Sequence, residues 1–148
     1  RYSQPFIDKA KELDRYISVL SEAATAVKSG VAAMHDVTEG GIFGALWEIA
    51  EASGVGLEID LKKIPLKQET VEICEFFGIN PYELISSGSM LMAAEDGNGL
   101  VMELEKAGIP AVVIGKATDS NDRVLLNEDE HRFLEPPKTD ELYKALSK

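Results

Sequence analysis

The segment from residue 31 to residue 53 constrains the fold of this chain more than any other. Val31 to Met34 is a short apolar run typical of a buried strand, and Ile42 to Ala52 has apolar residues at helical spacing. Between the two runs stands Met34-His35-Asp36-Val37-Thr38-Glu39-Gly40-Gly41. A strand that ends in a glycine turn and opens a helix directs several backbone N–H groups at one place, and together with the helix dipole they attract an anion such as phosphate. The sequence therefore points to this turn as the first place to look for function.

One interpretation of the turn is purely structural. Asp36 and Glu39 stand three residues apart, as in a capping box with Asp in the Ser/Thr position, and Thr38 could cap the helix instead. The two glycines would then serve only close packing or a tight turn.

The other interpretation is an anion site or a metal–phosphate site. Thr38 would donate through its hydroxyl, and Gly40 and Gly41 would donate through their N–H groups, to oxygen atoms of the ligand. Asp36 or Glu39 could hold Mg²⁺, which takes few protein ligands when phosphate is also bound. Both interpretations remain open on the residues alone.

Other polar residues fall into weaker patterns. His35 could donate a hydrogen bond to a ligand or carry a proton. Ser86-Ser87-Gly88-Ser89 suits a loop that contacts a ligand and equally suits a solvated turn. Asp96-Gly97-Asn98-Gly99 lacks further ligands at useful spacing and is interpreted as a turn with an N-cap. His131 lies in an acidic hairpin and is interpreted as a surface residue.

Composition narrows the class of protein. The 148 residues predict a single domain over positions 1–148, and a formal charge of −11 disfavours nucleic acid as a partner. No run approaches the ~18 apolar residues of a membrane span, so no membrane partner is expected. Cys74 is the only cysteine, which excludes an internal disulfide and predicts a cytoplasmic protein. The chain begins with Arg1 and not with Met, which predicts a processed chain or a piece of a longer one.

The order of expected elements predicts an α+β layered fold with one mixed sheet and helices packed on it. The expected helices cover residues 6–29, 41–53, 69–77, 81–85, 100–107 and 140–146, and the expected strands cover residues 31–34, 55–61, 90–95, 111–114, 124–126 and 132–134. The last two strands should form a hairpin. The unit over residues 90–114 should cross over right-handed if its strands are parallel.

Taken together, these motifs resemble a known family. The stretch from Met34 to Gly41, followed by Ala45-Leu46-Trp47-Glu48-Ile49-Ala50-Glu51-Ala52-Ser53-Gly54-Val55-Gly56, is similar to the C-terminal domain of the aminoimidazole ribonucleotide (AIR) synthetase, or PurM-like, superfamily. Shorter matches follow in the family's order: Ile64-Pro65, Gly78-Ile79-Asn80-Pro81, Ser87-Gly88-Ser89-Met90-Leu91 and Ile114-Gly115-Lys116. The resemblance covers nearly the whole chain.

The resemblance implies an α/β layered domain with a partly ferredoxin-like topology that forms one side of a substrate cleft. Members of the family pair it with an N-terminal ATP-binding domain, dimerise commonly through that domain, and use ATP and Mg²⁺ to activate an oxygen atom of a small phosphorylated or amide substrate. The main ATP and Mg²⁺ ligands lie in the N-terminal domain, so this chain alone is expected to be inactive and to hold no tightly bound cofactor. By match, Asp36, Thr38, Gly40 and Gly41 fall on the cleft-facing turn, and Ser87, Gly88 and Ser89 fall on a second cleft loop.

Within the superfamily, the chain resembles most the hydrogenase expression/formation (carbamoyl dehydratase) branch. That branch typically has Glu-Gly-Lys where this chain has Ser87-Gly88-Ser89, and it ends in a cysteine where this chain ends in Leu146-Ser147-Lys148. Two functions follow as hypotheses. The chain is either the substrate-side domain of an ATP-dependent phosphoryl-transfer enzyme, with Asp36 and His35 as catalytic candidates, or a non-catalytic assembly module that keeps the fold.

Overall fold

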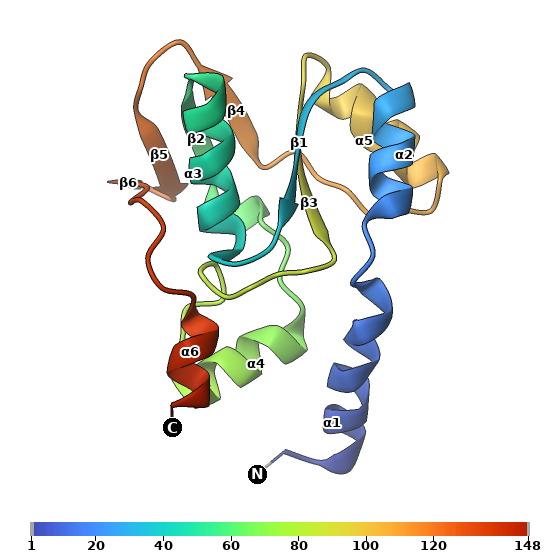
Figure 1. Ribbon diagram of the computed structural model, residues 1–148, viewed down its shortest axis with the longest axis vertical. Coiled ribbons are helices and arrows are strands. Elements are labelled where there is room, and N and C mark those ends of the chain that lie inside the picture. The colour runs from blue at the N-terminus through green and yellow to red at the C-terminus, as the bar shows by residue number, and fades with distance from the viewer. Residues whose placement is uncertain (1, 148) are drawn as a thin grey trace.

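The computed structural model describes residues 2–147, which fold into helices and strands in interleaved order (Figure 1). The helices are α1 (Gln4–Lys11), η1 (Glu12–Tyr16), α2 (Leu20–Lys28), α3 (Gly41–Ser53), η2 (Leu61–Lys63), α4 (Gln68–Phe77), α5 (Gly97–Lys106) and α6 (Glu141–Leu146), where η marks a 3₁₀ helix. The strands are β1 (Val31–Val37), β2 (Gly56–Asp60), β3 (Ser89–Ala94), β4 (Gly115–Thr118), β5 (Arg123–Asn127) and β6 (Glu130–Phe133).

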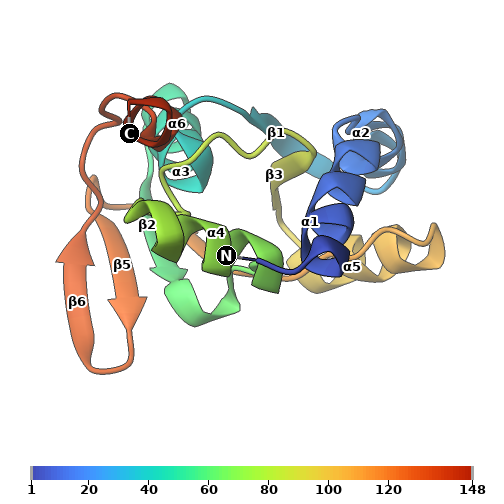
Figure 2. The same ribbon diagram turned by 90° about the horizontal axis from the view of Figure 1, so that it is seen from below.

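The strands lie in two sheets. β1 and β3 form an antiparallel pair, and the other four strands form a sheet in the order β4-β2-β5-β6. In this second sheet β2 and β5 are parallel, whereas β2–β4 and β5–β6 are antiparallel. The predicted α+β class with a mixed sheet is confirmed, and so is the hairpin, now β5–β6, which projects from one end of the molecule (Figure 2). The expectation of one sheet is wrong, because β1 and β3 pair only with each other.

Helix α3 joins the two sheets into one core. It runs from Gly41 to Ser53 as predicted, and it stands between the β1–β3 pair and the four-stranded sheet (Figure 1). Its apolar residues face both sides, which explains why the sequence shows apolar positions around most of this helix. The buried cluster consists of Val37, Phe43, Ala45, Leu46, Ala50, Leu57, Ile59, Leu61, Leu91, Leu125 and Leu134. A smaller cluster of Ala26, Leu100 and Leu104 packs α2 and α5 against residues of β1 and β3.

The predicted single helix over residues 6–29 is wrong. The helical spacing of apolar residues continues across the region, but the chain leaves the helix between Tyr16 and Leu20. The two halves contact different partners: Tyr2, just before α1, stacks on Phe6 at 4.5 Å and lies against Phe76 of α4, whereas Ala26 of α2 packs against α5. A straight helix could not reach both partners.

Two further expectations are wrong. Residues 81–85 form turns and no helix. The Tyr82 N–H donates to the Asn80 side chain (3.1 Å), as the predicted N-cap requires, but the Tyr82 carbonyl accepts from the Phe43 N–H of α3 (3.0 Å) and not from a following turn of helix. Residues 111–114 form no strand, and β4 begins one residue later at Gly115. Because β3 and β4 lie in different sheets, the strand–helix–strand crossover over residues 90–114 does not exist. None of the helices within residues 2–147 combines the length and the apolar character that crossing a membrane requires.

Candidate functional site

The antiparallel pairing of β1 and β3 brings the two predicted loops together. Val37, at the end of β1, pairs with Ser89, at the start of β3, and Asp36 pairs with Met90. The turn that follows β1 and the Ser87–Ser89 loop that leads into β3 therefore meet at one end of this strand pair. Residues about fifty positions apart in sequence thus share one surface, which the sequence motifs alone could not show.

Backbone N–H groups at the glycine turn are already bonded within the chain. The Gly40 N–H donates to Asp140 Oδ2 at 2.6 Å, and the Gly41 N–H donates to the Thr38 carbonyl at 3.1 Å. Both glycines are buried. The expectation that these two N–H groups are open to a ligand is therefore wrong. The physical reason is that a carboxylate from the C-terminal segment takes the place at the start of α3 where the helix dipole favours negative charge.

Asp140 is held in that position from both sides. It is the N-cap residue of α6, where its Oδ1 accepts from the Leu142 N–H at 2.8 Å, and it is only 2% exposed. Its neighbour Glu141 is 3% exposed and accepts from the Asn80 N–H at 3.3 Å. The two adjacent carboxylates thus fasten the C-terminal segment to the α3 turn and to the loop after α4.

Gly41 could not be any other residue without a local shift. Its φ is +62°, and a Cβ atom added there would lie 2.5 Å from the Tyr82 carbonyl oxygen and 2.6 Å from the Leu84 carbonyl oxygen. Gly88 is similarly confined, with a φ of +99° and the Tyr16 carbonyl oxygen 2.1 Å from the position of an added Cβ atom. Both glycines of the paired loops are therefore needed for close approach of the backbone.

The polar side chains around these glycines are exposed. Within residues 2–147, none of their side chains forms a hydrogen bond or an ion pair. The residues concerned are Asp36, Thr38, Glu39, Ser87 and Ser89. At these loops the Gly40 and Gly41 N–H groups are bonded within the chain, whereas the side-chain hydroxyl and carboxylate groups have no partner within residues 2–147.

His35 is positioned by two acceptors. Its Nε2 lies 2.6 Å from Glu48 Oε2 on α3, and its Nδ1 lies 2.7 Å from the Asp36 carbonyl oxygen. Because both neighbouring atoms are acceptors, the doubly protonated ring can donate to each of them. The His35–Glu48 pair thus lies directly beside Asp36, and Glu48 is a residue that the sequence motifs did not single out.

The described residues do not gather a metal site. Within residues 2–147 no three His, Cys, Asp or Glu side chains are grouped so that they could hold a metal ion. Asp36 therefore offers one carboxylate ligand, and the rest of a Mg²⁺ shell would have to come from phosphate, water or other protein residues.

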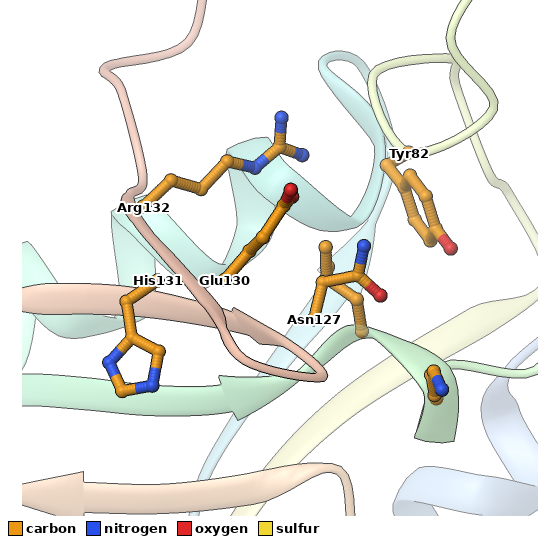
Figure 3. A pocket seen from close by; sticks show the side chains of 7 residues that line it. Tyr82, Asn127, Glu130, His131 and Arg132 are labelled. Carbon is orange, nitrogen blue, oxygen red and sulfur yellow. The ribbon is translucent and has the colours of Figure 1, made fainter.

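A hollow of about 490 Å³ lies elsewhere, between the β5–β6 hairpin, η2 and the turn at Tyr82 (Figure 3). It is lined by Leu61, Lys62, Tyr82, Asn127, Glu130, His131 and Arg132. Sequence reasoning treated this hairpin as a solvated surface and missed the hollow. The turn Glu128-Asp129 is the sequence signal that could have indicated the hollow. With a two-residue turn, Asn127 pairs with Glu130, and Arg132, two residues after Glu130, lies on the same face of the hairpin.

Comparison with known proteins confirms the family resemblance. Residues 3–127 match the family described as AIR synthase related protein, C-terminal domain. The carbamoyl dehydratase HypE of Rhodobacter capsulatus is 33% identical over 96 residues, which are 62% of this chain and 28% of that protein. The chain therefore spans less than a third of the length of this relative.

Solved structures share the fold. The crystal structure of E. coli HypE superposes with a TM-score of 0.74 at 25% identity, over 86% of this chain and 42% of that one. A hydrogenase maturation protein HypE in complex with ATP superposes with a TM-score of 0.65 at 21% identity, over 78% of this chain and 38% of that one. At that identity the second likeness concerns the fold alone.

Proposed function

This chain belongs to the family of AIR synthase related proteins, as a C-terminal domain, and from that premise we propose that it is the substrate-side domain of an ATP-dependent phosphoryl-transfer enzyme. The relative named carbamoyl dehydratase HypE supports an enzyme of the hydrogenase-maturation type. The observation that carries the proposal is that the two predicted loops meet at the end of the β1–β3 pair, where Val37 pairs with Ser89.

In this proposal the exposed side chains, and not the glycine N–H groups, contact the ligand. The hydroxyl groups of Thr38, Ser87 and Ser89 donate to phosphate oxygens or to the acceptor substrate. Gly40 and Gly41 set the shape of the turn, since their N–H groups are bonded to Asp140 and to the Thr38 carbonyl. Phosphoryl transfer needs mainly positioning and charge stabilisation, which such a row of donors provides.

Asp36 and His35 are the residues proposed to handle protons. Asp36 orients the acceptor or accepts its proton, and the neighbouring His35, whose Nε2 lies 2.6 Å from Glu48 Oε2, is the second candidate for proton transfer at the same surface. Glu39 is proposed to orient bound water or substrate at the rim of the turn. These roles need no backbone donor from the turn.

ATP and Mg²⁺ are proposed to be bound mainly outside this chain. The chain carries a formal charge of −11 and gathers no metal-ligand cluster within residues 2–147, so its own residues do not form a complete site for either group. An N-terminal ATP-binding domain of the same protein is the proposed partner, with a homodimer formed through that domain. Asp36 would add one carboxylate, and bound Mg²⁺ would supply positive charge to the transferring phosphoryl group.

An Asp36→Asn variant of the full-length protein tests the proposal. We expect its ATP turnover to fall by about 10² or more, in line with the usual contribution of a positioned acid–base group, while its thermal unfolding is unchanged because Asp36 is exposed. Asp119→Asn is the matched control, since Asp119 is also exposed and lies on the loop after β4. Equal turnover in wild type and in the Asp36→Asn variant would contradict the proposal.

A second function, a non-catalytic assembly module, is favoured by one observation. The Gly40 N–H, which a ligand anion would be expected to use, is bonded to a carboxylate of the chain itself. Isothermal titration calorimetry on the full-length protein separates the two functions. Binding of ATP–Mg²⁺ supports the enzyme, whereas binding of a protein partner with no response to ATP–Mg²⁺ or inorganic phosphate supports the module.

A further inference from the structure

The hollow beside the β5–β6 hairpin contains charged groups that have no close ion-pair partner within residues 2–147, although Arg132 interacts electrostatically with Glu135 at longer range. Within residues 2–147, neither Arg132 nor Glu130 forms an ion pair of 4.0 Å or less, and neither side chain forms a hydrogen bond. The only other cation at the rim, Lys62, is already paired with Glu128. The hollow thus presents one guanidinium and one carboxylate whose side chains form no hydrogen bond and no close ion pair within residues 2–147.

Strand register explains why these two groups face the hollow. Leu125, a core residue that is 2% exposed, pairs with Arg132, and Asn127 pairs with Glu130. Paired residues and residues two apart share one face of a sheet, so Asn127, Glu130 and Arg132 continue the face that Leu125 uses to pack the core. Figure 3 shows the side chain of His131 directed away from those of Glu130 and Arg132.

The ring of Tyr82 forms the aromatic wall of the hollow. Tyr82 stacks on the buried Phe43 with ring centroids 5.1 Å apart and planes at 8°, and the Arg132 guanidinium lies 5.7 Å from the Phe43 ring. Phe43 belongs to α3 and to the main core, so the wall is rigid. At this distance the contact between Arg132 and Phe43 is weak, and the N–H donors of the guanidinium remain available.

From this arrangement we infer that the hollow binds a small zwitterion, an α-amino acid with an apolar or aromatic side chain. The guanidinium of Arg132 can hold a carboxylate through two parallel hydrogen bonds, and Glu130 can hold an ammonium group. Asn127 can bond to either group, and Tyr82 and Leu61 face the side chain. The volume of about 490 Å³ falls within the range of about 300–1,000 Å³ that is usual for small-molecule sites.

Charge decides against a simple anion or a simple cation. An anion would meet Glu130 and the negative charge of the whole chain, −11. A cation would meet Arg132. A ligand that carries both charges at the spacing of an amino acid satisfies both free groups at once. This inference is independent of the proposed phosphoryl transfer, because none of the residues of the two paired loops lines the hollow.

Calorimetric titration of the full chain with L-phenylalanine tests the inference. We expect saturable binding at one site. The single-charge analogues 3-phenylpropionate and 2-phenylethylamine should bind about tenfold more weakly or less, since each lacks one charge-assisted pair. L-alanine should also bind more weakly, because it does not reach the aromatic wall.

Variants assign the binding to the hollow. Arg132→Gln and Glu130→Gln should each weaken L-phenylalanine binding about tenfold or more. Asp129→Asn is the control, since Asp129 is exposed in the turn of the same hairpin and does not line the hollow, and it should leave the affinity unchanged; thermal unfolding of all three variants verifies that they are folded. Absence of L-phenylalanine binding at millimolar concentration, equal binding of 3-phenylpropionate, or unchanged affinity in Arg132→Gln would each overturn the inference.

Discussion

The glycine turn before α3 and the hollow beside β6 use their polar groups in opposite ways. At the turn, the sequence suggests backbone donors that a ligand could use, but they form hydrogen bonds within the chain; the Gly40 N–H donates to Asp140 at 2.6 Å. At the hollow, side chains that look like ordinary solvated charges lie on the core-facing side of the sheet, and Arg132 and Glu130 have no ion-pair partner within residues 2–147.

A local motif thus identifies polar groups, and distant residues decide whether those groups are bonded within the chain. Asp140 is one hundred positions from Gly40 and accepts a hydrogen bond from its N–H. In contrast, no residue within 2–147 forms a hydrogen bond or a close ion pair with the side chain of Arg132 or of Glu130. If this is correct, polar contacts at the turn should stabilise the fold, and the charges of the hollow should not. Mutations in the two regions test that contrast.

Gly41→Ala should have the largest effect. The substitution places a methyl group at a φ of +62° and 2.5 Å from the Tyr82 carbonyl oxygen, so it combines left-handed strain with overpacking. We expect a loss of about 3 kcal/mol in the free energy of unfolding, measured by urea denaturation. Gly30→Ala is the matched control, because Gly30 has a φ of +78° with no atom within 4 Å of an added Cβ.

The control variant should lose only about 1 kcal/mol, the cost of the left-handed backbone alone. Equal losses in Gly41→Ala and Gly30→Ala would mean that the turn is loosely packed, and the proposed contrast with the hollow would fail.

Asp140→Ala should have the second largest effect. It removes the acceptor of the Gly40 N–H and of the Leu142 N–H and leaves a buried donor without a partner. We expect a loss of about 2–3 kcal/mol, measured by urea denaturation. Asp140→Asn keeps one acceptor oxygen and should lose about 1 kcal/mol. A change below about 0.5 kcal/mol in Asp140→Ala would show that the carboxylate is not what holds the C-terminal segment.

Adding inorganic phosphate to the Asp140→Ala variant tests whether the start of α3 attracts anions. If the start of α3 attracts anions as the dipole argument states, phosphate should raise the unfolding temperature of Asp140→Ala more than that of wild type, in which Asp140 occupies the place. Equal shifts in both proteins would mean that phosphate acts elsewhere.

The sequence predicted those parts of the fold whose signals are local. Helix α3 was located at both ends because its apolar spacing, and the glycines at positions 40, 41 and 54, lie within one segment. The β5–β6 hairpin was located because a polar turn separates two apolar runs. The helix over residues 6–29 was mispredicted because spacing does not reveal that its halves pack against α4 and α5, which lie far along the chain.

The candidate site divides in the same way. The types of residue at the turn could be read from sequence, and the pairing of Val37 with Ser89 could not, since it depends on how β1 and β3 meet. Asp140 carried no local signal for its contact with Gly40. The charges of the hollow required the hairpin register, which fixes the face on which Arg132 lies. The proposed roles of Asp36, His35 and the serines stay predictions.

A third contact, between Lys9 of α1 and Glu69 of α4, is a further case in which a distant residue pairs with a charged group. Lys9 forms an ion pair with Glu69, whose side chain is 6% exposed, and hydrogen bonds from Lys9 and from a backbone N–H lower the pKa of Glu69 below its ordinary value of 4.5. A carboxylate with a lowered pKa stabilises the folded state above pH 4.5, and this contribution is lost as the pH falls through the folded-state pKa.

The difference in unfolding free energy between wild type and Glu69→Gln should therefore be largest near neutral pH and should shrink below pH 4.5. The effect should be modest, because Lys9 is 70% exposed and water screens the pair. Lys9→Met should reduce the pH dependence. A difference that stays constant from neutral pH to pH 3 would show that the ion pair contributes nothing.

Arg132→Gln should have the smallest effect on stability. The guanidinium forms no ion pair within residues 2–147, and its contact with the Phe43 ring at 5.7 Å is at the outer limit of a cation–π interaction. We expect a change within about 0.5 kcal/mol in urea denaturation, as for a surface residue, although the same variant should lose zwitterion binding. A loss above about 1.5 kcal/mol would mean that Arg132 covers the core as Asp140 covers the turn. The two regions would then be alike, and a binding role for the hollow would no longer be needed to explain its unpaired charge.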